Sequence, residues 1–318
     1  MTPTVMRAAV VGAFGGPDTL RVRNLPVPEP QEGEVLVRVH AAGVNAIDWA
    51  TRAGRGVGVE GFPAVLGWDV SGTVAATGPG VRRFTEGDAV FGMPRFPSLA
   101  GGYAEYAVAP EGELAAKPDG VDHVVAASLP MVGLTAWQTL FEHGGLRPGH
   151  RVLVSGAAGG VGHIAVQLAV DAGAEVIGTA SPANHDFVRS LGARRAVDYR
   201  TVPLQKEVGD VDLAVDPMGG AEFFRLLDVV RPGGIVVTLK GEGPDHRQTA
   251  QAHGVRAGFT YVHPDGPVLD RIAGLLSAGA VRPEIQRVFR LDEVGQAHAL
   301  GEEGHVRGRL VLDIKGDA

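Results

Sequence analysis

The spacing of hydrophobic residues changes along the chain, and the change predicts two kinds of structure. Up to about residue 118, short apolar or alternating runs lie between glycines and prolines, which is typical of β-strands. Such runs cover residues 6–11, 20–24, 34–40, 72–76, 88–91 and 103–108. The spacing becomes helical over 121–141, and strands and helices then alternate to about Pro264. We therefore expect an all-β module followed by a doubly wound α/β domain.

The end of the chain returns to the pattern of the beginning. Residues 288–291 and 309–314 predict strands, with a helix between them near 293–300. A tail of this kind most simply rejoins the first module. A helix is also expected at 221–230, followed by a turn at 231–234 and a strand at 235–239.

The most informative stretch is residues 151–181. A short apolar run at 151–155 predicts a buried strand, and it is followed at 156–162 by the turn GAAGGVG. From Val161 the apolar residues recur at helical spacing, and Gly173 stands where a helix C-cap glycine is expected. Residues 175–179 predict the next strand, so the stretch forms one βαβ unit.

The glycines of this turn predict a dinucleotide site. The usual G-x-G-x-x-G fingerprint is A-x-G-x-x-G here, formed by Ala157, Gly159 and Gly162. A pyrophosphate can approach helix N-terminal N–H groups only where side chains leave room for it. The alternative is a glycine-rich turn without a ligand.

The end of the second strand favours one dinucleotide. NAD sites usually have an Asp or Glu about 20 residues after the first glycine. This chain has Thr179, Ala180, Ser181 and Pro182 there, without a carboxylate. Hydrogen-bond donors follow, at Asn184, His185, Arg189, Tyr199 and Arg200. The pattern favours NADP(H) over NAD(H), and the alternative for each arginine is a solvated surface charge.

Composition limits the remaining classes. A chain of 318 residues predicts two domains, and a net charge of −7 argues against nucleic-acid binding. The chain contains no cysteine, which excludes disulfides, thiolate zinc ligands and a thiol nucleophile. Neither a signal peptide nor an apolar run of membrane-spanning length is evident. We expect a cytoplasmic protein with a small-molecule substrate.

Several motifs resemble the medium-chain dehydrogenase/reductase superfamily, and within it the quinone oxidoreductase (ζ-crystallin-like) branch. They are AAGVNAID at 41–48, GWDVSGTV at 67–74, GDAV at 87–90, GGYAEY at 101–106, GLTAW at 133–137, AAGGVG at 157–162, DLAVDPMGG at 212–220 and HVRGR at 305–309. The resemblance implies a GroES-like β-rich catalytic domain at 1–122 and 268–318, and a Rossmann NADP(H)-binding domain at 123–267. It also implies a homodimer, joined through edge strands such as residues 258–263.

The resemblance further implies that no metal is bound. Zinc alcohol dehydrogenases of the superfamily have a Cys in the early loop and a Gly-His-Glu motif later. Here the early loop, residues 42–48, lacks Cys, and the later motif is Gly67-Trp68-Asp69. Without those ligands a tetrahedral zinc site is incomplete. Hydride transfer to an already activated acceptor then remains as the accessible chemistry.

Three residues are catalytic candidates by resemblance. Asn45 matches the family's asparagine near nicotinamide and substrate, and Asp48 matches the acid of the same loop. Thr135 resembles a residue near the nicotinamide. The alternative for Asp48 is a local cap interaction, and that for Thr135 is a buried hydroxyl within a helix. No tyrosine follows Arg52-Ala53-Gly54, so the tyrosine that many family members carry there is missing.

The cofactor-binding candidates follow from the same resemblance and lie in four places. They are Ala158, Gly159, Gly160 and Val161 at the pyrophosphate; Ser181, Asn184, His185 and Tyr199 at the adenosine phosphate; Leu239 and Gly241 at a strand end near the nicotinamide; and Arg309 before the last strand. The alternative for Leu239 and Gly241 is a plain strand terminus.

Three functions remain open. The first is an NADPH-dependent quinone reductase, and the second is a reductase of enones or enoyl thioesters on the same scaffold. The third is a protein that binds NADPH without turnover and acts as a structural or regulatory partner.

Overall fold

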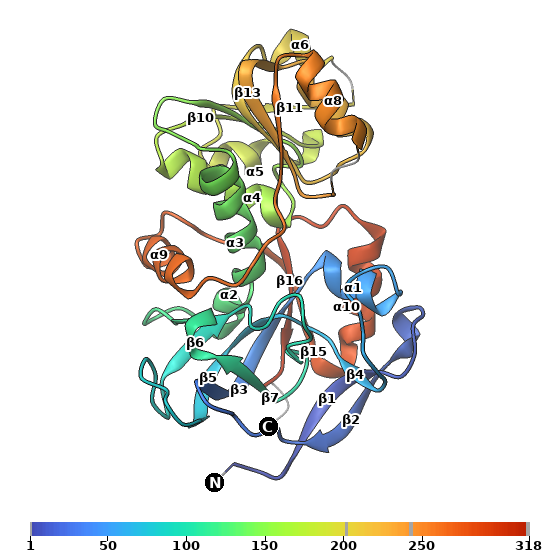
Figure 1. The fold of residues 1–318 in the computed structure, drawn as a ribbon, viewed down its shortest axis with the longest axis vertical. Helices are drawn as coiled ribbons and strands as arrows, with labels where there is room; N and C mark the ends of the chain where they lie inside the picture. Colours follow the sequence, from blue (N-terminus) through green and yellow to red (C-terminus); the bar gives the residue numbers. More distant parts are fainter. Residues whose placement is uncertain (1, 201–202, 242–243, 316–318) are drawn as a thin grey trace. The chain divides into compact units, whose positions relative to one another are not determined.

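The computed structural model describes residues 2–200, 203–241 and 244–315. The chain divides into two compact units (Figure 1). The first has the bounds Met1–Leu134, His263–Ala278 and Pro283–Ala318, and the second Thr135–Val262 and Gly279–Arg282. The sequence placed the boundaries between the catalytic and cofactor-binding domains after residues 122 and 267, and these functional boundaries stay a prediction.

Antiparallel pairing predominates in the first unit, whose larger sheet also contains one parallel strand pair. Strand β1 (Val5–Val11) lies between β2 (Leu20–Pro26) and β4 (Ala64–Val65). A larger sheet has the order β15-β16-β3-β5-β6-β8, with β7 also paired to β3. Its strands are β3 (Glu34–Val44), β5 (Asp69–Thr77), β6 (Ala89–Gly92), β7 (Tyr106–Pro110), β8 (Leu114–Ala116), β15 (Ile285–Arg290) and β16 (Arg309–Asp313).

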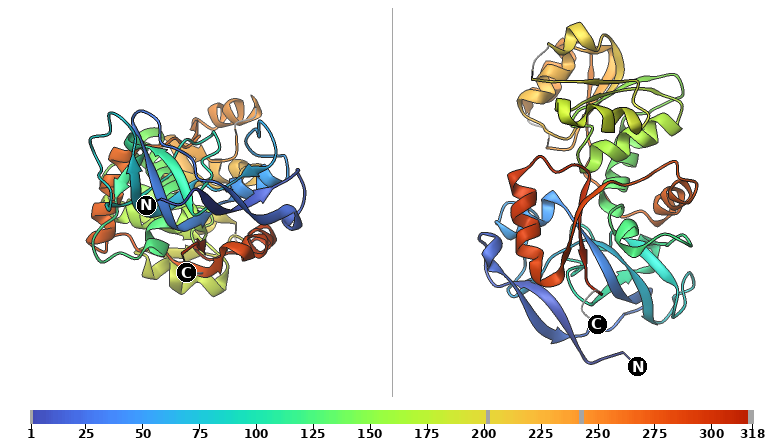
Figure 2. Two further views of the ribbon diagram at one scale, coloured as in Figure 1. Left: turned by 90° about the horizontal axis from the view of Figure 1, so that it is seen from below. Right: turned by 180° about the vertical axis from the view of Figure 1, so that it is seen from behind.

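The tail rejoins this unit, as expected. Strand β16 pairs antiparallel with β3, bringing Leu310 opposite Val44 and Leu312 opposite Ala42. Figure 2 shows the red C-terminal strand beside the blue strands of the beginning of the chain. Its side chains Leu310 and Leu312 join the buried core of the first unit. The GroES-like, β-rich character predicted for this part of the chain is confirmed.

The all-β prediction for the first module is wrong at one important place. Helix α1 (Ala46–Arg52) follows β3 directly, because Asn45 stands at its N-cap and Asp48 at its third position. Helix α10 (Val294–Glu303) packs against α1, and Gly301 makes this contact close: a Cβ there would lie 2.5 Å from the Trp49 ring. Helices α2 (His123–Ala127) and α9 (Gly266–Ser277), with 3₁₀ turns at Pro17–Thr19, Glu111–Glu113 and Leu291–Glu293, complete the unit.

The second unit is the predicted doubly wound domain. Its sheet has the order β11-β10-β9-β12-β13-β14, and the pairs are parallel. The strands are β9 (Arg151–Val154), β10 (Glu175–Thr179), β11 (Arg195–Val197), β12 (Val211–Asp216), β13 (Val230–Thr238) and β14 (Arg256–Phe259). Figure 1 shows α4 (Gly160–Asp171), α5 (His185–Ser190), α6 (Leu204–Glu207) and α8 (Pro244–Ala252) beside them, and α7 (Ala221–Leu227) follows β12.

Two helical expectations need correction. The stretch 121–141 is not one helix: α2 ends before α3 (Pro130–Trp137), because proline restricts the preceding residue and cannot continue the ladder. A π-helical turn, Gln138–His143, then follows α3. Helix α7 ends at Leu227 rather than 230, and the expected turn at 231–234 belongs to β13, whose pairing with β12 shifts register there.

None of the helices in the described part of the chain is long and apolar enough to cross a membrane.

The glycine inside β10 yields a test of packing. A Cβ at Gly178 would lie 2.6 Å from the Ala157 Cβ and 2.7 Å from a Val188 methyl. We expect Gly178→Ala to lower the free energy of unfolding by about 1–3 kcal/mol, measured by denaturant titration. Gly274→Ala in α9 is the control, because a Cβ there meets nothing within 4 Å and helix propensity favours alanine. Equal stability of Gly178→Ala and the wild type would contradict this packing.

Candidate active site and cofactor-binding edge

Asn45 and Asp48 lie together at the start of α1, in the first unit. The Asn45 backbone N–H donates to Asp48 Oδ2 at 2.6 Å, and the Asp48 N–H donates to the Asn45 carbonyl at 3.0 Å. Asn45 is 4% exposed and Asp48 is fully buried. The cap interaction considered for Asp48 is therefore present. A catalytic role of either residue stays a prediction.

The Asn45 amide is held by two charged side chains. Its Nδ2 donates to Asp69 Oδ2 at 2.9 Å, and its Oδ1 accepts from Arg309 Nη2 at 2.9 Å. Arg309 Nη2 also donates to Asp69 Oδ2 at 2.9 Å, closing a buried triangle. The three contacts assign the amide orientation, since only Nδ2 can donate to a carboxylate.

Backbone groups complete the buried pair of Asp69 and Arg309. Asp69 Oδ1 accepts from the Met131 N–H at 2.7 Å, and Arg309 Nε donates to the Ser128 carbonyl at 2.7 Å. Burial raises the pKa of Asp69 and lowers the pKa of Arg309, while the ion pair acts on each in the opposite direction. A pair buried this deeply needs such additional hydrogen bonds to offset the loss of water.

Asp48 has an unusual ionisation. Burial, opposed by hydrogen bonds from Asn45 and Tyr103, raises the pKa of Asp48 from 3.8 to about 7. The Tyr103 hydroxyl donates to Asp48 Oδ2 at 2.8 Å. Asp48 Oδ1 is buried and has no hydrogen-bond partner among the described residues. A proton on Asp48 would therefore reside on Oδ1.

Sequence reasoning missed Asp69, Tyr103 and His298 as members of this polar cluster. Asp69 and Tyr103 stood within quoted family motifs but were given no role. A lone charged residue inside the apolar run that follows Gly67 is the signal that identifies Asp69, because unpaired charges are rarely buried. His298 lies on the buried face of α10, which the sequence does not distinguish from an ordinary core position.

The predicted phosphate turn lies in the second unit, between β9 and α4. Gly159 is the N-cap of α4, and no side chain caps this end. The first backbone N–H groups of a helix have no partner within it, so they can bind an anion. Gly162 permits the tight turn, because a Cβ there would lie 2.2 Å from the Gly156 carbonyl oxygen. Ala158, Gly159, Gly160 and Val161 thus surround a helix start that fits a pyrophosphate.

The predicted adenosine-side residues follow β10 and β11. Asn184 Nδ2 donates to Ser181 Oγ at 3.2 Å, and His185 Nε2 lies 3.2 Å from the Ala180 carbonyl oxygen. Tyr199 follows β11, with the Arg200 guanidinium 5.7 Å from the centre of its ring. Parallel strands place these residues at the same edge of the sheet as the phosphate turn.

The remaining predicted residues are distributed over both units. Leu239 and Gly241 follow β13 at the same edge of the parallel sheet, where the Leu239 N–H donates to the Asp216 carbonyl at 2.9 Å. Thr135 is buried in α3 and begins the second unit. Arg309 belongs to the first unit, with Asn45.

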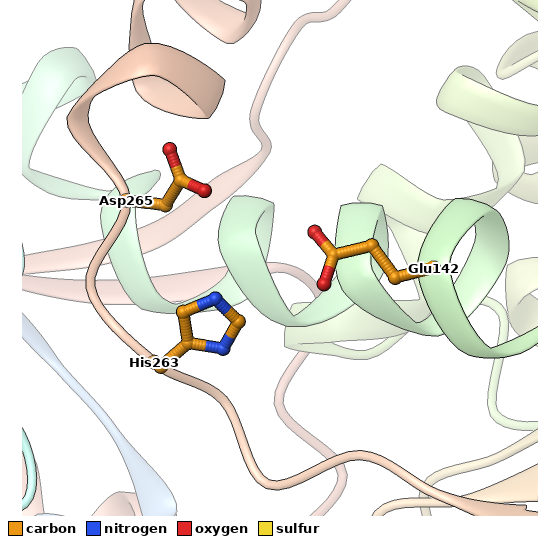
Figure 3. Close-up of side chains that lie close together, drawn as sticks. All are labelled: Glu142, His263 and Asp265. Atoms are coloured by element: carbon orange, nitrogen blue, oxygen red, sulfur yellow. The ribbon is translucent and has the colours of Figure 1, made fainter.

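Figure 3 shows Glu142, His263 and Asp265, whose side chains are of types that can bind a metal ion. Exposed acidic groups are common without a metal. Asp265 has a structural role there, since its side chain accepts from the Val268 N–H at 2.9 Å at the start of α9. His263 and Asp265 belong to the first unit, whereas Glu142 lies in the π-helical turn of the second. We assign no metal centre to these residues.

Comparison with known proteins identifies the family. Residues 31–119 match the alcohol dehydrogenase GroES-like domain, and residues 191–312 match the zinc-binding dehydrogenase family. NAD(P)H oxidoreductase RTN4IP1, mitochondrial, from Danio rerio is 35% identical over 99% of this chain and 92% of its own. The chain belongs to the medium-chain dehydrogenase/reductase family.

Two further relatives define the branch. Quinone oxidoreductase from Lama guanicoe is 31% identical over 98% of both chains. The solved quinone oxidoreductase from Coxiella burnetii has a TM-score of 0.92 and 35% identity, covering 98% of this chain and 99% of its own. The protein is an NAD(P)H-dependent oxidoreductase of the quinone oxidoreductase type, and the resemblance seen in the sequence is confirmed.

One expectation is contradicted by these relatives. We expected a cytoplasmic protein because no signal peptide is evident, but the Danio rerio relative is named mitochondrial. The absence of a secretory signal says nothing about other compartments, so the inference had too little support.

The Asp69–Arg309 pair yields a test of the site. We expect Arg309→Met to lower the free energy of unfolding by about 3–5 kcal/mol, because it leaves a buried carboxylate without its partner. Arg307→Met is the matched control: Arg307 pairs with Glu284 at the surface, where an ion pair contributes about 1 kcal/mol or less. Denaturant titration of both variants measures the difference. Similar losses in the two variants would contradict the buried pair.

Proposed function

We propose that the protein transfers a hydride from NADPH to a quinone, or to another acceptor whose carbonyl is conjugated with a double bond, without zinc. The observation that carries the proposal is the buried Asn45 amide, whose orientation Asp69 and Arg309 fix. An amide nitrogen carries two hydrogens, and one of them donates to Asp69. The other is left for an acceptor carbonyl.

This N–H donor suits an activated acceptor. Negative charge develops on the carbonyl oxygen during hydride addition, and a donor fixed in advance stabilises that charge. One hydride from NADPH and one proton together convert a quinone into a hydroquinone and leave NADP⁺. We assign the proton to solvent or to a donor other than a loop tyrosine, because none follows Arg52-Ala53-Gly54.

The residues at the zinc-ligand positions support a zinc-free reaction. Trp68 is fully buried and donates its indole N–H to the Ser98 carbonyl at 2.7 Å. Both oxygens of Asp69 already accept hydrogen bonds, from Met131, Asn45 and Arg309. No cysteine is present in the chain. This donor set does not fit tetrahedral zinc.

The edge of the parallel sheet supports NADPH as the hydride source. Bound nicotinamide would supply the hydride, and the residues of the second unit would hold the dinucleotide. The α4 turn would bind the pyrophosphate, and Ser181, Asn184, His185 and Tyr199 the 2′-phosphate side. Residues 180–185, directly after β10, contain no carboxylate to repel that phosphate or to bind the ribose hydroxyls of NAD instead. Leu239, Gly241, Thr135 and Arg309 remain candidates for the other contacts.

A homodimer remains part of the proposal. Strand β14 lies at the end of the parallel sheet, so its outer edge is able to pair with the same strand of a second copy. The expectation itself comes from the family resemblance.

The reaction is tested by following nicotinamide oxidation with NADPH and, separately, with NADH. The acceptors are a simple quinone, a cyclic enone and an enoyl thioester, and an alcohol with NADP⁺ is the control. We expect rapid oxidation of NADPH by the quinone, slower reaction with NADH and no alcohol oxidation. Prior treatment with a chelator should leave the rate unchanged.

Other outcomes identify the alternatives. Turnover confined to the enone or the thioester would assign the protein to the alkene reductases. Alcohol oxidation that a chelator abolishes would contradict the zinc-free reaction. NADPH binding without turnover of any acceptor would favour a structural or regulatory protein.

The cofactor preference is tested at Ser181. We expect Ser181→Asp to lower kcat/KM for NADPH by about 100-fold or more, because a carboxylate beside the 2′-phosphate places like charges together. The value for NADH should rise or stay constant. Ser190→Asp is the control, since it adds the same charge at an exposed position of α5. A parallel loss with both cofactors would contradict the assignment of Ser181.

A further inference from the structure

A buried chain of hydrogen bonds joins helix α10 to the start of helix α1 within the first unit. The Tyr103 hydroxyl lies 2.8 Å from Asp48 Oδ2 and 3.3 Å from His298 Nε2. His298 Nδ1 lies 3.4 Å from Arg52 Nη1, and Arg52 Nη2 pairs with Glu302 at 2.7 Å. Asp48, Tyr103 and His298 are fully buried, and Arg52 is 2% exposed.

Arg52 sets the direction of this chain. A guanidinium can only donate, so His298 Nδ1 accepts and its proton must reside on Nε2. Burial, with the charge of Arg52, lowers the pKa of His298 to about 3, which keeps the ring neutral. Nε2–H then donates to the Tyr103 oxygen, and the Tyr103 hydroxyl must donate onward to Asp48.

Tyr103 also supports Asp69, the carboxylate that accepts from the Asn45 amide. Its ring lies against the backbone of Gly67, where a Cβ would come within 2.4 Å of Tyr103 Cδ1. The Tyr103 N–H donates to the Leu66 carbonyl at 2.9 Å. Tyr103 therefore contacts the segment leading to Asp69 as well as the Asp48 carboxylate.

Asp48 transmits this restraint to Asn45. Its Oδ2 accepts both the Tyr103 hydroxyl and the Asn45 backbone N–H. The charged groups that act on Asp48 beyond its own helix are Asp69 and Arg309, and Tyr103 supplies the other polar contact. Loss of the Tyr103 donor would leave Oδ2 with the Asn45 contact alone, and Oδ1 has no partner among the described residues.

We propose that Tyr103 and His298 are positioning residues for hydride transfer: they hold Asp48 against the Asn45 backbone and thereby fix the amide that faces the acceptor. The inference rests on the proposed role of Asn45 as the donor to the acceptor carbonyl. Neither residue touches the acceptor, and both act through Asp48.

The first experiment measures quinone reduction by Tyr103→Phe, with Tyr106→Phe as the matched control. Tyr106 is also buried in the first unit, but its hydroxyl makes no hydrogen bond to any described residue. We expect kcat to fall by about 10- to 100-fold in Tyr103→Phe, as for a small displacement of a reacting group, and to stay near wild type in Tyr106→Phe. KM for NADPH should change less than about twofold in both, as a selective loss of orientation requires.

The pH profile separates positioning from a general loss of packing. The Tyr103 hydrogen bond favours ionised Asp48, so its removal should move the acidic limb of kcat/KM for the quinone toward higher pH. Asp48→Asn keeps an acceptor oxygen but cannot ionise, so this limb should disappear. An unchanged limb in both variants would overturn the proposal.

Variants of His298 test the direction of the hydrogen bonds. Gln places an N–H donor near the position of Nε2, whereas Leu places none there. We expect His298→Gln to keep most of the activity and His298→Leu to resemble Tyr103→Phe. These two variants test the positioning role if Tyr103→Phe does not fold. Equal activity of the two would contradict the hydrogen bond from His298 to Tyr103 as part of that role.

Asn45→Ala separates the two proposals. A loss of about 100-fold or more in kcat supports Asn45 as the donor. If Asn45→Ala is impaired while Tyr103→Phe equals Tyr106→Phe, the positioning role is wrong and the proposed function stands. If Asn45→Ala is as active as the wild type, both are wrong.

Discussion

The buried ion pair of Asp69 and Arg309 is the constraint on which the polar interior of the first unit depends. It joins residues 240 positions apart, at the start of β5 and the start of β16. Two charges removed from water need every remaining hydrogen-bonding group nearby to be satisfied. Ser128, Met131 and Asn45 supply those groups, so the return of the tail, the start of α3 and the N-cap of α1 are fixed together.

The Asp69–Arg309 pair determines which polar groups of this dehydrogenase fold are free to take part in chemistry. The matching family model carries the name zinc-binding dehydrogenase. That match covers residues 191–312, whereas Asn45 and Trp68 lie in the part that matches the GroES-like domain, where the carboxylate of Asp69 is occupied by hydrogen-bond donors. In the proposed zinc-free reaction a rigid amide takes the place of a Lewis acid, and a rigid amide suits acceptors that are already activated.

The second unit follows a simpler rule. Because its strands run parallel, the residues after β9, β10, β11 and β13 reach one edge of the sheet. Glycine at 162 and 178 permits the close approach of turn, helix and strand at this edge. The glycine turn of this unit could be predicted from the sequence because strand, glycine turn and helix are local patterns, whereas the other candidate residues of the unit came from the family resemblance and stay a prediction.

The sequence by itself determined the two-part organisation, the βαβ unit at 151–179, the return of the tail and the family, because periodicity, glycine spacing and motifs are local or contiguous signals. It did not show helix α1, because this helix has only seven residues and one N-cap and lies between predicted strands. Only the tertiary structure brought Asn45, Asp69 and Arg309 together, and only it gave Asp48 its raised pKa, through burial and the nearby Asp69 carboxylate and against the hydrogen bonds from Asn45 and Tyr103. Those properties depend on desolvation and on contacts between residues far apart in the chain, and no spacing in the sequence records either.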